Sequence, residues 1–374
     1  MRVLTVFGTR PEAIKLAPVV KAMQAEPGIV HTTCVTGQHR QMLDQVLRIF
    51  GITPEFDLSL MRPGQDLTHV TTAVLTGIGE VIDKVQPDWV VVQGDTTTAF
   101  AAALAAFYRK VPVAHVEAGL RTGDIYSPFP EEMNRKLASA IAQIHFPPTE
   151  KAASNLRREN IEASRILVTG NTVIDALLWM TDRLSKDAAL SAEAERQFGF
   201  TPSGKRIILV TGHRRENLDG GIGNVCRALR RIADRGDVQV VYPVHLNPIV
   251  QTAVREVLAG HPGVHLIAPL EYLPFVAVMQ KAFVIVTDSG GIQEEAPSLG
   301  KPVLVTRSVT ERPEAVSSGT ARLVGTSETT VFDALNELLD DPSAYGKMAR
   351  AQNPFGDGHA ASRIVQSMLK ETRR

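Results

Sequence analysis

The sequence predicts an α/β protein built from two Rossmann-like domains, each with a parallel sheet covered by helices on both faces. Short apolar, β-branched runs alternate with helical segments along the chain, and this alternation is typical of parallel sheets. It stops over residues 185–205, which are polar and helix-forming, and then starts again. A chain of 374 residues is also long for one core, so two domains are expected.

The same pattern sets the domain boundaries. We expect a first domain over residues 1–169 and a second over residues 170–357, facing each other across a cleft. An amphipathic helix over about 358–374 follows the turn NPFGDG, and we expect it to pack back on the first domain.

In the first domain, the strands are expected at residues 3–7, 30–35, 89–93 and 111–116, with two short strands at 145–148 and 165–169. The helices between them are expected at residues 12–25, 41–50, 67–84, 99–108, 128–142 and 172–184.

Two carboxylates follow neighbouring strands of this domain at the point where each strand ends. Asp95 follows residues 89–93, and Glu117 follows residues 111–116. Three threonines after Asp95 can cap the next helix, so Asp95 is free to face a ligand. Glu131 begins a helix, where the helix dipole alone would explain an acid, but the nearby Asp95 and Glu117 favour a functional role for it.

Two cations lie at the end of the first strand. Arg10 follows the strand directly and Lys15 lies one turn into the next helix, an arrangement that favours a bound phosphate. A surface salt bridge for Arg10 and a solvated position for Lys15 are equally compatible with the sequence.

In the second domain, the strands are expected at residues 206–211, 238–243, 264–267, 283–287, 303–306 and 322–324, with helices between them. The strand over 283–287 ends in Asp288 and the turn Ser289, Gly290, Gly291, after which a short helix begins. Such a helix start presents unpaired amides without Cβ atoms in the way, which suits a phosphate. Glu295, one turn later, can reach a ribose diol. A simple N-cap and turn is the alternative.

This domain contains further candidates. His213 follows a strand and can donate to a phosphate oxygen, although a core or capping histidine fits as well. The apolar residues from Leu270 to Phe275 are expected to form a loop that either holds a planar base or only packs. Arg312 follows the strand over 303–306 and is expected at the same end of the sheet as Ser289.

Composition excludes several classes of protein. The 40 basic and 40 acidic side chains balance, so neither nucleic acid nor an anionic membrane is an expected partner. The N-terminus begins directly as a strand and no stretch is long enough to span a bilayer, so a cytoplasmic protein is expected. Cys34 and Cys226 are isolated in apolar surroundings and are expected to be buried thiols.

We expect neither a metal nor a nicotinamide cofactor. No histidine pair has the spacing of a zinc site, and no acidic cluster resembles a magnesium site. The glycine pairs at 77/79 and 221/223 do not follow a strand and lack a third glycine, unlike a dinucleotide fingerprint.

Eight motifs along the chain resemble those of the non-hydrolysing UDP-N-acetylglucosamine 2-epimerases. In order, they are GTRPEAIKLAPV at Gly8, VQGDTTTAF at Val92, HVEAGLRTGD at His115, PFPEEMNRKL at Pro128, TGNTVIDAL at Thr169, TGHRREN at Thr211, PVHLNP at Pro243 and DSGGIQEEAPSLGKPVLV at Asp288.

The resemblance implies a fold of the glycosyltransferase-B type, no cofactor, a homodimer, and reversible conversion of UDP-N-acetylglucosamine to UDP-N-acetylmannosamine. It also implies activation by UDP-N-acetylglucosamine in bacterial members, for which Gln41, Arg214 and His245 are our candidates. By motif, it gives Asp95, Glu117, Glu131 and His213 to catalysis, and Arg10, Lys15, Leu270, Phe275, Ser289, Gly290, Gly291, Glu295 and Arg312, together with His213, to UDP.

Three other functions fit the same sequence features. They are a UDP-sugar transferase of the same fold, a hydrolysing 2-epimerase, and a nucleotide-sugar sensor without chemistry. A transferase needs an acceptor, and a hydrolysing enzyme releases free sugar. A sensor would keep every measurable function in Asp95→Asn.

Overall fold

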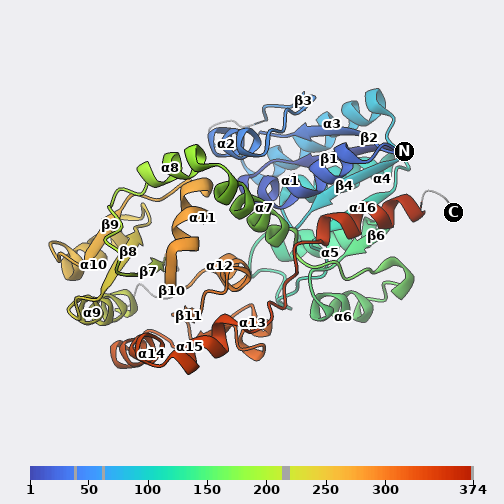
Figure 1. Cartoon of the computed structure of the whole chain (residues 1–374). Helices are drawn as coiled ribbons and strands as arrows, with labels where there is room; N and C mark the ends of the chain where they lie inside the picture. Colours follow the sequence, from blue (N-terminus) through green and yellow to red (C-terminus); the bar gives the residue numbers. More distant parts are fainter. Residues whose placement is uncertain (38–39, 61–63, 213–219, 372–374) are drawn as a thin grey trace. The chain divides into compact units, whose positions relative to one another are not determined.

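The computed structural model describes residues 1–37, 40–60, 64–212 and 220–371 (Figure 1). The chain divides into two compact units. The first contains Met1–Ala176 together with Phe355–Arg374, and the second contains Leu177–Pro354. The first boundary therefore falls after Ala176, inside a helix, where the sequence suggested residue 169.

The first unit contains a six-stranded parallel sheet in the order β3-β2-β1-β4-β5-β6. Its strands are β1 (Arg2–Phe7), β2 (Val30–Val35), β3 (Phe56–Asp57), β4 (Trp89–Gln93), β5 (Val113–Val116) and β6 (Ile144–Phe146). Its helices are α1 (Arg10–Ala25), α2 (Arg40–Phe50), α3 (Leu67–Val85), α4 (Thr97–Tyr108), α5 (Glu131–Ile141), α6 (Glu150–Arg158), the 3-10 turn η1 (Ala163–Arg165), the first part of α7 (Thr172–Lys186), and α16 (Ala360–Glu371).

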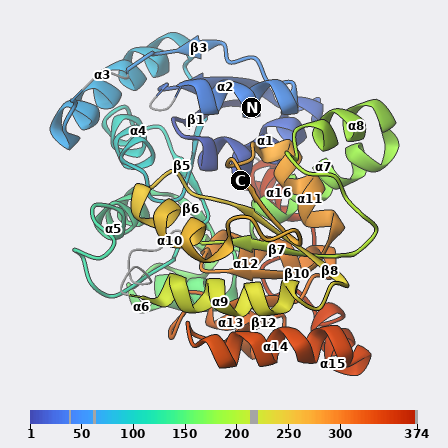
Figure 2. The ribbon, with the colours of Figure 1, turned by 90° about the vertical axis from the view of Figure 1, so that its left-hand side faces the viewer.

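The second unit repeats this topology with the order β12-β11-β10-β7-β8-β9, again all parallel. Its strands are β7 (Arg206–Thr211), β8 (Val238–Pro243), β9 (Val264–Ile267), β10 (Ala282–Thr287), β11 (Val303–Val305) and β12 (Ala321–Leu323). Its helices are α8 (Ala188–Arg196), α9 (Gly221–Ala233), α10 (Pro248–Leu258), α11 (Tyr272–Lys281), α12 (Gly290–Glu295), the 3-10 turn η3 (Ala296–Leu299), α13 (Pro313–Ser317), α14 (Glu328–Asp340) and α15 (Pro342–Ala349). Figure 2 shows α9 and α14, which pack against each other on one face of this sheet.

Each sheet is covered by apolar helix faces. In the first unit, the alanine-rich helix α4 packs against α3 and α5, and its alanines from Ala101 to Ala106 are fully buried. Small side chains allow helices to approach closely, because less volume separates the backbones. In the second unit, α9 and α14 bury residues such as Leu229 and Leu335. The predicted α/β class with two Rossmann-like parallel sheets is therefore confirmed.

One predicted strand of the first unit is wrong. Residues 163–165 form the turn η1, and only Ile166 makes an isolated bridge, to His145. Pro147 and Pro148 follow β6 and have no N–H to donate, so a regular ladder cannot continue there. The two-residue strand β3 was not predicted.

Three further features bear on the sequence predictions. Cys34 and Cys226 are free and buried, as predicted, and burial raises the pKa of each thiol to about 12. None of the helices in the described ranges combines the length and apolar composition needed to cross a bilayer. Helix α16 packs against α1 in the first unit.

Candidate functional site

The strand order places the site at one point of the first sheet. From β1 the chain continues outward through β2 and β3, and it then returns to β4, which lies on the other side of β1. The loops after β1 and β4 therefore diverge and leave a crevice at the carboxyl edge, where ligands bind in open α/β sheets. Arg10, Asp95 and Glu117 all follow strands at this edge.

Glu117 is the most heavily bonded of these residues. Its side chain is almost fully buried, and Lys15 lies 2.6 and 2.7 Å from its two oxygens. Gln93 and Asn171 also donate side-chain amides to the carboxylate, Asn171 at 3.0 Å. Glu117 has φ of 58°, a left-handed conformation that is unusual for a residue with a side chain. Such strain at a strand end is typical of functional sites.

The contact between Lys15 and Glu117 joins two residues that the sequence assigned separately. Lys15 was predicted to bind phosphate, yet in the structure its ammonium is paired with the carboxylate. Burial disfavours a charge on either group, and the opposite charge of the partner counters this effect.

Asp95 has a different partner. Arg135 of α5 lies 2.6 Å from its carboxylate, and Asn134 donates to its backbone carbonyl at 2.9 Å. Thr96 is the N-cap of α4, so the prediction that a threonine would perform this role is confirmed. Asp95 is therefore held by α5, the helix that Glu131 begins.

The two adjacent glutamates of α5 have different environments. Glu132 is fully buried and accepts hydrogen bonds from the amides of Thr122 and Gly123. Burial opposes its charge, but these amides and Arg135 hold the pKa of Glu132 below its usual value. Glu131 is half-buried, and within the described ranges it makes no hydrogen bond or ion pair.

Glu12 connects the two loops that border the crevice. This buried carboxylate accepts hydrogen bonds from the amides of Gly8 and Thr9 and from the Thr9 hydroxyl. It also accepts from the hydroxyl of Thr96, at 2.7 Å, in the loop after β4. Thr9 and Glu12 form a capping box, and the T-x-x-E spacing was the sequence signal that could have revealed it.

His115 contacts the loop that follows β4 at the same edge. It is fully buried in β5, and its Nε2 lies 2.7 Å from the carbonyl of Gly94. Burial lowers the pKa of His115 to about 4, so the ring is neutral near pH 7 and Nε2 carries the proton that it donates. The Gly94 turn, which leads into Asp95, is fixed in this way.

Arg10 lies at the first position of α1 and is half-buried. Among the described residues it makes no ion pair or hydrogen bond. A guanidinium at this edge without a carboxylate partner there is suited to an external anion.

The second unit has its own carboxyl edge, with β7 and β10 at the point where the strand order reverses. Ser289 is the N-cap of α12, and its side chain makes no capping hydrogen bond. The guanidinium of Arg312 lies 3.7 Å from the ideal Cβ position of Gly290, and a Glu295 oxygen lies 3.5 Å from that of Gly291. Arg312 is bound to Glu294. The structure therefore brings together the five residues that were predicted for this site, namely Ser289, Gly290, Gly291, Glu295 and Arg312.

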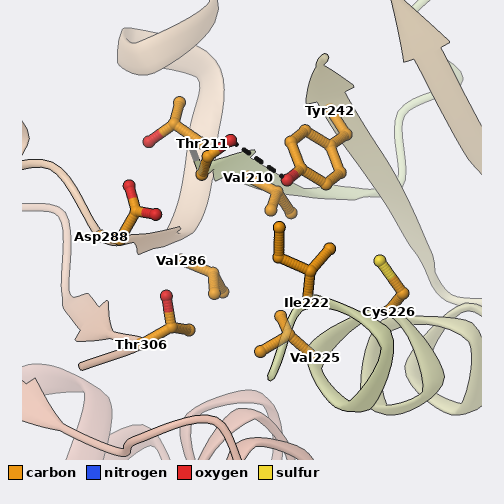
Figure 3. A pocket seen from close by; sticks show the side chains of 10 residues that line it. Val210, Thr211, Ile222, Val225, Cys226, Tyr242, Val286, Asp288 and Thr306 are labelled. Carbon is orange, nitrogen blue, oxygen red and sulfur yellow. Dashed lines mark hydrogen bonds between the residues drawn. The ribbon is translucent and has the colours of Figure 1, made fainter. Parts of the chain in front are cut away.

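A cavity of about 20 Å³ lies between helix α9 and strands β7, β8 and β10. Figure 3 shows its lining, with Asp288 and Thr306 on one side and Tyr242 and Cys226 on the other. The volume is close to that of one water molecule. This cavity is therefore too small for a sugar or a nucleotide.

The apolar segment predicted as a loop is only partly one. Leu270 precedes Glu271, the N-cap of α11, and Phe275 lies in the first turn of this helix. The backbone carbonyl of Glu271 accepts from the Phe275 amide, and the helix begins at Tyr272. The prediction of a loop up to Phe275 is therefore wrong. A proline at position 274 is tolerated there, since a first turn needs no amide donor.

The candidates for a second nucleotide site are mostly outside the described structure. His213 and Arg214 lie outside the described residues, and Gln41 belongs to α2, but its side chain is not described. His245 is exposed after β8, and its Nδ1 accepts from the amide of Asn247.

A family model described as UDP-N-acetylglucosamine 2-epimerase matches residues 21–369. The chain belongs to the UDP-N-acetylglucosamine 2-epimerase family.

Several relatives of this family cover nearly the whole chain. The UDP-N-acetylglucosamine 2-epimerase of Yersinia pestis is 55% identical over 98% of both chains. The crystal structure of the UDP-GlcNAc 2-epimerase from Neisseria meningitidis, bound to UDP-GlcNAc, is 49% identical with a TM-score of 0.89, covering 99% of this chain and 100% of the other. The Methanocaldococcus jannaschii enzyme in complex with UDP-GlcNAc and UDP is 34% identical, with a TM-score of 0.79 over 99% and 100% of the two chains.

Membership of the 2-epimerase family explains the resemblance of the eight motifs and confirms it. Sequence reasoning missed four residues that the structure adds to the edge, namely Glu12, Gln93, Arg135 and Asn171. Gln93 was detectable as a polar residue at the end of a buried strand, and Asn171 lay within a quoted motif without a role.

Proposed function

We propose that this chain converts UDP-N-acetylglucosamine reversibly to UDP-N-acetylmannosamine by epimerisation at C2. The observation that carries the proposal is the buried Glu117 carboxylate, bound to Lys15, Gln93 and Asn171 at the sheet switch point of a chain of this family. A strained, multiply bonded acid at such an edge is poorly explained by fold stability alone.

The chemistry requires an elimination. The proton at C2 is not adjacent to a carbonyl, so simple removal would leave an unstabilised carbanion. We propose that the C2–H bond and the C1–O bond to UDP break together, on opposite faces, which gives 2-acetamidoglucal and UDP. UDP then adds back to C1, while C2 receives a proton on the other face. No net oxidation occurs, and no external group is consumed.

Glu117 is our candidate for the group that takes the C2 proton. Lys15 and two amides favour its ionised form, and a general base must be ionised to accept a proton. Asp95 and Glu131 are the candidates for returning a proton from the other side, and His213 is the candidate for donating to the departing diphosphate.

The second unit supplies the proposed diphosphate site. The amides of the turn at Ser289, Gly290 and Gly291, with Arg312, would stabilise the charge that grows on departing UDP. Glu295 would accept from the ribose, and Leu270 and Phe275 would contact the uracil. In the first unit, Arg10 is our candidate for contact with a phosphate oxygen, and Lys15, also a candidate for UDP, is paired with Glu117.

The test uses the purified chain with UDP-N-acetylglucosamine alone in heavy water. We expect UDP-N-acetylmannosamine in the proton NMR spectrum, with deuterium at C2 of both epimers. Release of free sugar would instead identify a hydrolysing enzyme, and no reaction until an acceptor is added would identify a transferase.

Two variants separate an enzyme from a sensor. Glu117→Gln and Asp95→Asn should each lower turnover by about 10²–10⁴-fold, while UDP binding measured by calorimetry is retained. If Asp95→Asn left turnover intact, Asp95 would have no part in the chemistry.

We also propose that the chain works as a homodimer in the cytoplasm, without a metal or cofactor. The two cysteines are free and buried, which suits a reducing compartment.

Within the described residues no cluster could hold a metal ion, and turnover that survives EDTA would support metal independence. Activation by UDP-N-acetylglucosamine through Gln41, Arg214 and His245 remains part of this proposal.

A further inference from the structure

Asn171 connects the proposed proton acceptor to the point where the chain leaves and re-enters the first unit. It lies between Gly170 and helix α7, and it is 2% exposed. Its Nδ2 donates to Oε1 of Glu117 at 3.0 Å. Its Oδ1 accepts from the amide of Val173 at 3.1 Å, in the first turn of α7.

These two contacts fix the orientation of the Asn171 amide group. The Val173 amide can only donate, so the side-chain atom that it meets must be the oxygen. The nitrogen then faces Glu117, which as a carboxylate can only accept. A flipped amide would place two donors together at α7 and two acceptors together at Glu117.

The backbone around Asn171 is fixed as well. Its N–H donates to the carbonyl of Phe355 at 2.6 Å, where the chain returns. Gly170 has φ of +92°, and a Cβ there would lie 3.2 Å from Cα of Gly356. Two chain segments far apart in sequence therefore meet tightly, and Asn171 is held between them.

We propose that Asn171 is a positioning residue that holds Glu117 as an oriented carboxylate for the transfer of the C2 proton. The inference rests on the proposed function, because it assumes that Glu117 exchanges a proton with the substrate. Asn171 itself need not touch the substrate.

Other charged groups act on Glu117 and stay in place when Asn171 is changed. Among the described residues, Lys15 of α1 is a cation in contact with it. His115 of β5, neutral near pH 7, lies beneath, and Asp95, after β4, is paired with Arg135 of α5. A shift seen in Asn171→Ser, which removes the amide donor and adds no charge, can therefore be attributed to the lost donor.

The decisive variant is Asn171→Asp. Aspartate keeps the acceptor for the Val173 amide and is a good N-cap residue, so helix α7 retains its start. It replaces the donor facing Glu117 with a second carboxylate, and two carboxylates at this distance share a proton. We expect the acidic limb of the kcat/KM profile to move up by about one pH unit or more in Asn171→Asp. In Asn171→Ser, which removes the donor without adding a charge, we expect a smaller upward shift, and this variant tests the amide donor by itself.

The matched control is Asn155→Asp. Asn155 donates its amide to the carbonyl of Gly119 at 2.9 Å, so the same change is made in the same region, but against a backbone group. We expect this variant to lose stability to urea and to keep the position of the acidic limb.

A second readout does not depend on turnover. The side-chain carboxyl carbon of Glu117, assigned by comparison with Glu117→Gln in carbon-labelled protein, should titrate at higher pH in Asn171→Asp than in the wild-type chain. Unchanged titration of Glu117 and an unchanged acidic limb in a folded Asn171→Ser protein would overturn the inference. A wild-type chain that does not epimerise would instead overturn the proposed function.

Discussion

Glycine at position 119 is required by two independent features of the loop that follows Glu117. Its φ is +86°, and a Cβ would lie 2.3 Å from the carbonyl oxygen of Ala152 in α6. The first feature strains any side chain, and the second moves the helix or the loop. The loop that fixes the backbone of Glu117 therefore depends on close contact with α6.

We predict that Gly119→Ala destabilises the first unit by about 3 kcal/mol or more, since strain and overpacking add. Gly123→Ala is the matched control, because Gly123 has a similar φ of +90° with open space around its Cβ position. It should cost only about 1–2 kcal/mol, the cost of the backbone conformation. Urea unfolding measures both, and equal losses would show that the contact with Ala152 is unimportant.

At the scale of elements, the loops after β1 and β4 are joined by a contact between the half-buried Thr96 and the buried Glu12. Thr96 accepts from the amide of Ala99, at 3.0 Å, as the N-cap of α4, and its hydroxyl donates to Glu12 of α1. Burial raises the pKa of Glu12, although these donors oppose the shift. A buried carboxylate that loses a donor is costly.

We predict that Thr96→Val destabilises the chain by about 2–3 kcal/mol, from the lost cap and the lost donor to Glu12. Thr96→Ser keeps the hydroxyl and should cost less than about 1 kcal/mol. Urea denaturation of the two variants gives the comparison. Similar losses in both would mean that the γ-methyl group, rather than the hydroxyl, matters at this position.

The adjacent strands β5 and β6 carry paired, buried histidines, His115 and His145. Burial lowers the pKa of His115 to about 4 and that of His145 to about 3. In the unfolded chain the histidine pKa is about 6.5. Between these values the unfolded state binds more protons, so stability falls as pH drops below about 6.5 and the loss continues to about pH 3–4.

We predict that His145→Leu reduces this acid dependence by up to about 1.4 kcal/mol per pH unit. The measurement is the free energy of unfolding in urea at pH 7, 6 and 5. Phe146→Leu, in the same strand, is the control, because it changes a buried side chain without removing a titratable group and should leave the slope as in the wild-type chain. A slope that did not change in His145→Leu would mean that His145 is protonated in the folded state.

Strand periodicity was enough to predict most elements and the edge that carries the site, because buried parallel strands are continuous apolar runs. It could not show which of Glu131 and Glu132 is buried. The structure shows that Glu132 is the one that accepts from the amides of Thr122 and Gly123, and this depends on how α5 is oriented about its axis. It also could not find Asn171 as a partner of Glu117, because that contact is made between residues 54 positions apart in the chain.

At the scale of the whole molecule, both ends of the chain belong to the same unit. The first unit contains Met1–Ala176 and Phe355–Arg374, so the chain leaves it once and returns once. Helix α16 packs against α1 and buries Ile364 and Met368 completely. The amides of Ala360 and Ala361 at its start are bound by the carboxylate of Asp175. A change near the C-terminus should therefore weaken the unit that begins the chain.

The two tryptophans allow this to be tested, because Trp89 lies in β4 of the first unit and Trp179 lies in the part of α7 that belongs to the second. Trp179→Phe and Trp89→Phe give chains whose fluorescence reports one unit each. In these backgrounds, Ile364→Ala should cost about 2–5 kcal/mol and lower the urea midpoint seen by Trp89 more than that seen by Trp179.

Leu335→Ala is the matched control, because Leu335 of α14 is equally buried, but in the core of the second unit. It removes a side chain of similar size, so its cost should be comparable, and it should lower mainly the midpoint seen by Trp179. Equal shifts at both tryptophans in both variants would mean that the chain unfolds as one cooperative body. A larger effect of Ile364→Ala on the midpoint seen by Trp179 would contradict the assignment of α16 to the first unit. Helix α16 packs against α1, so its loss should destabilise the unit that Trp89 reports.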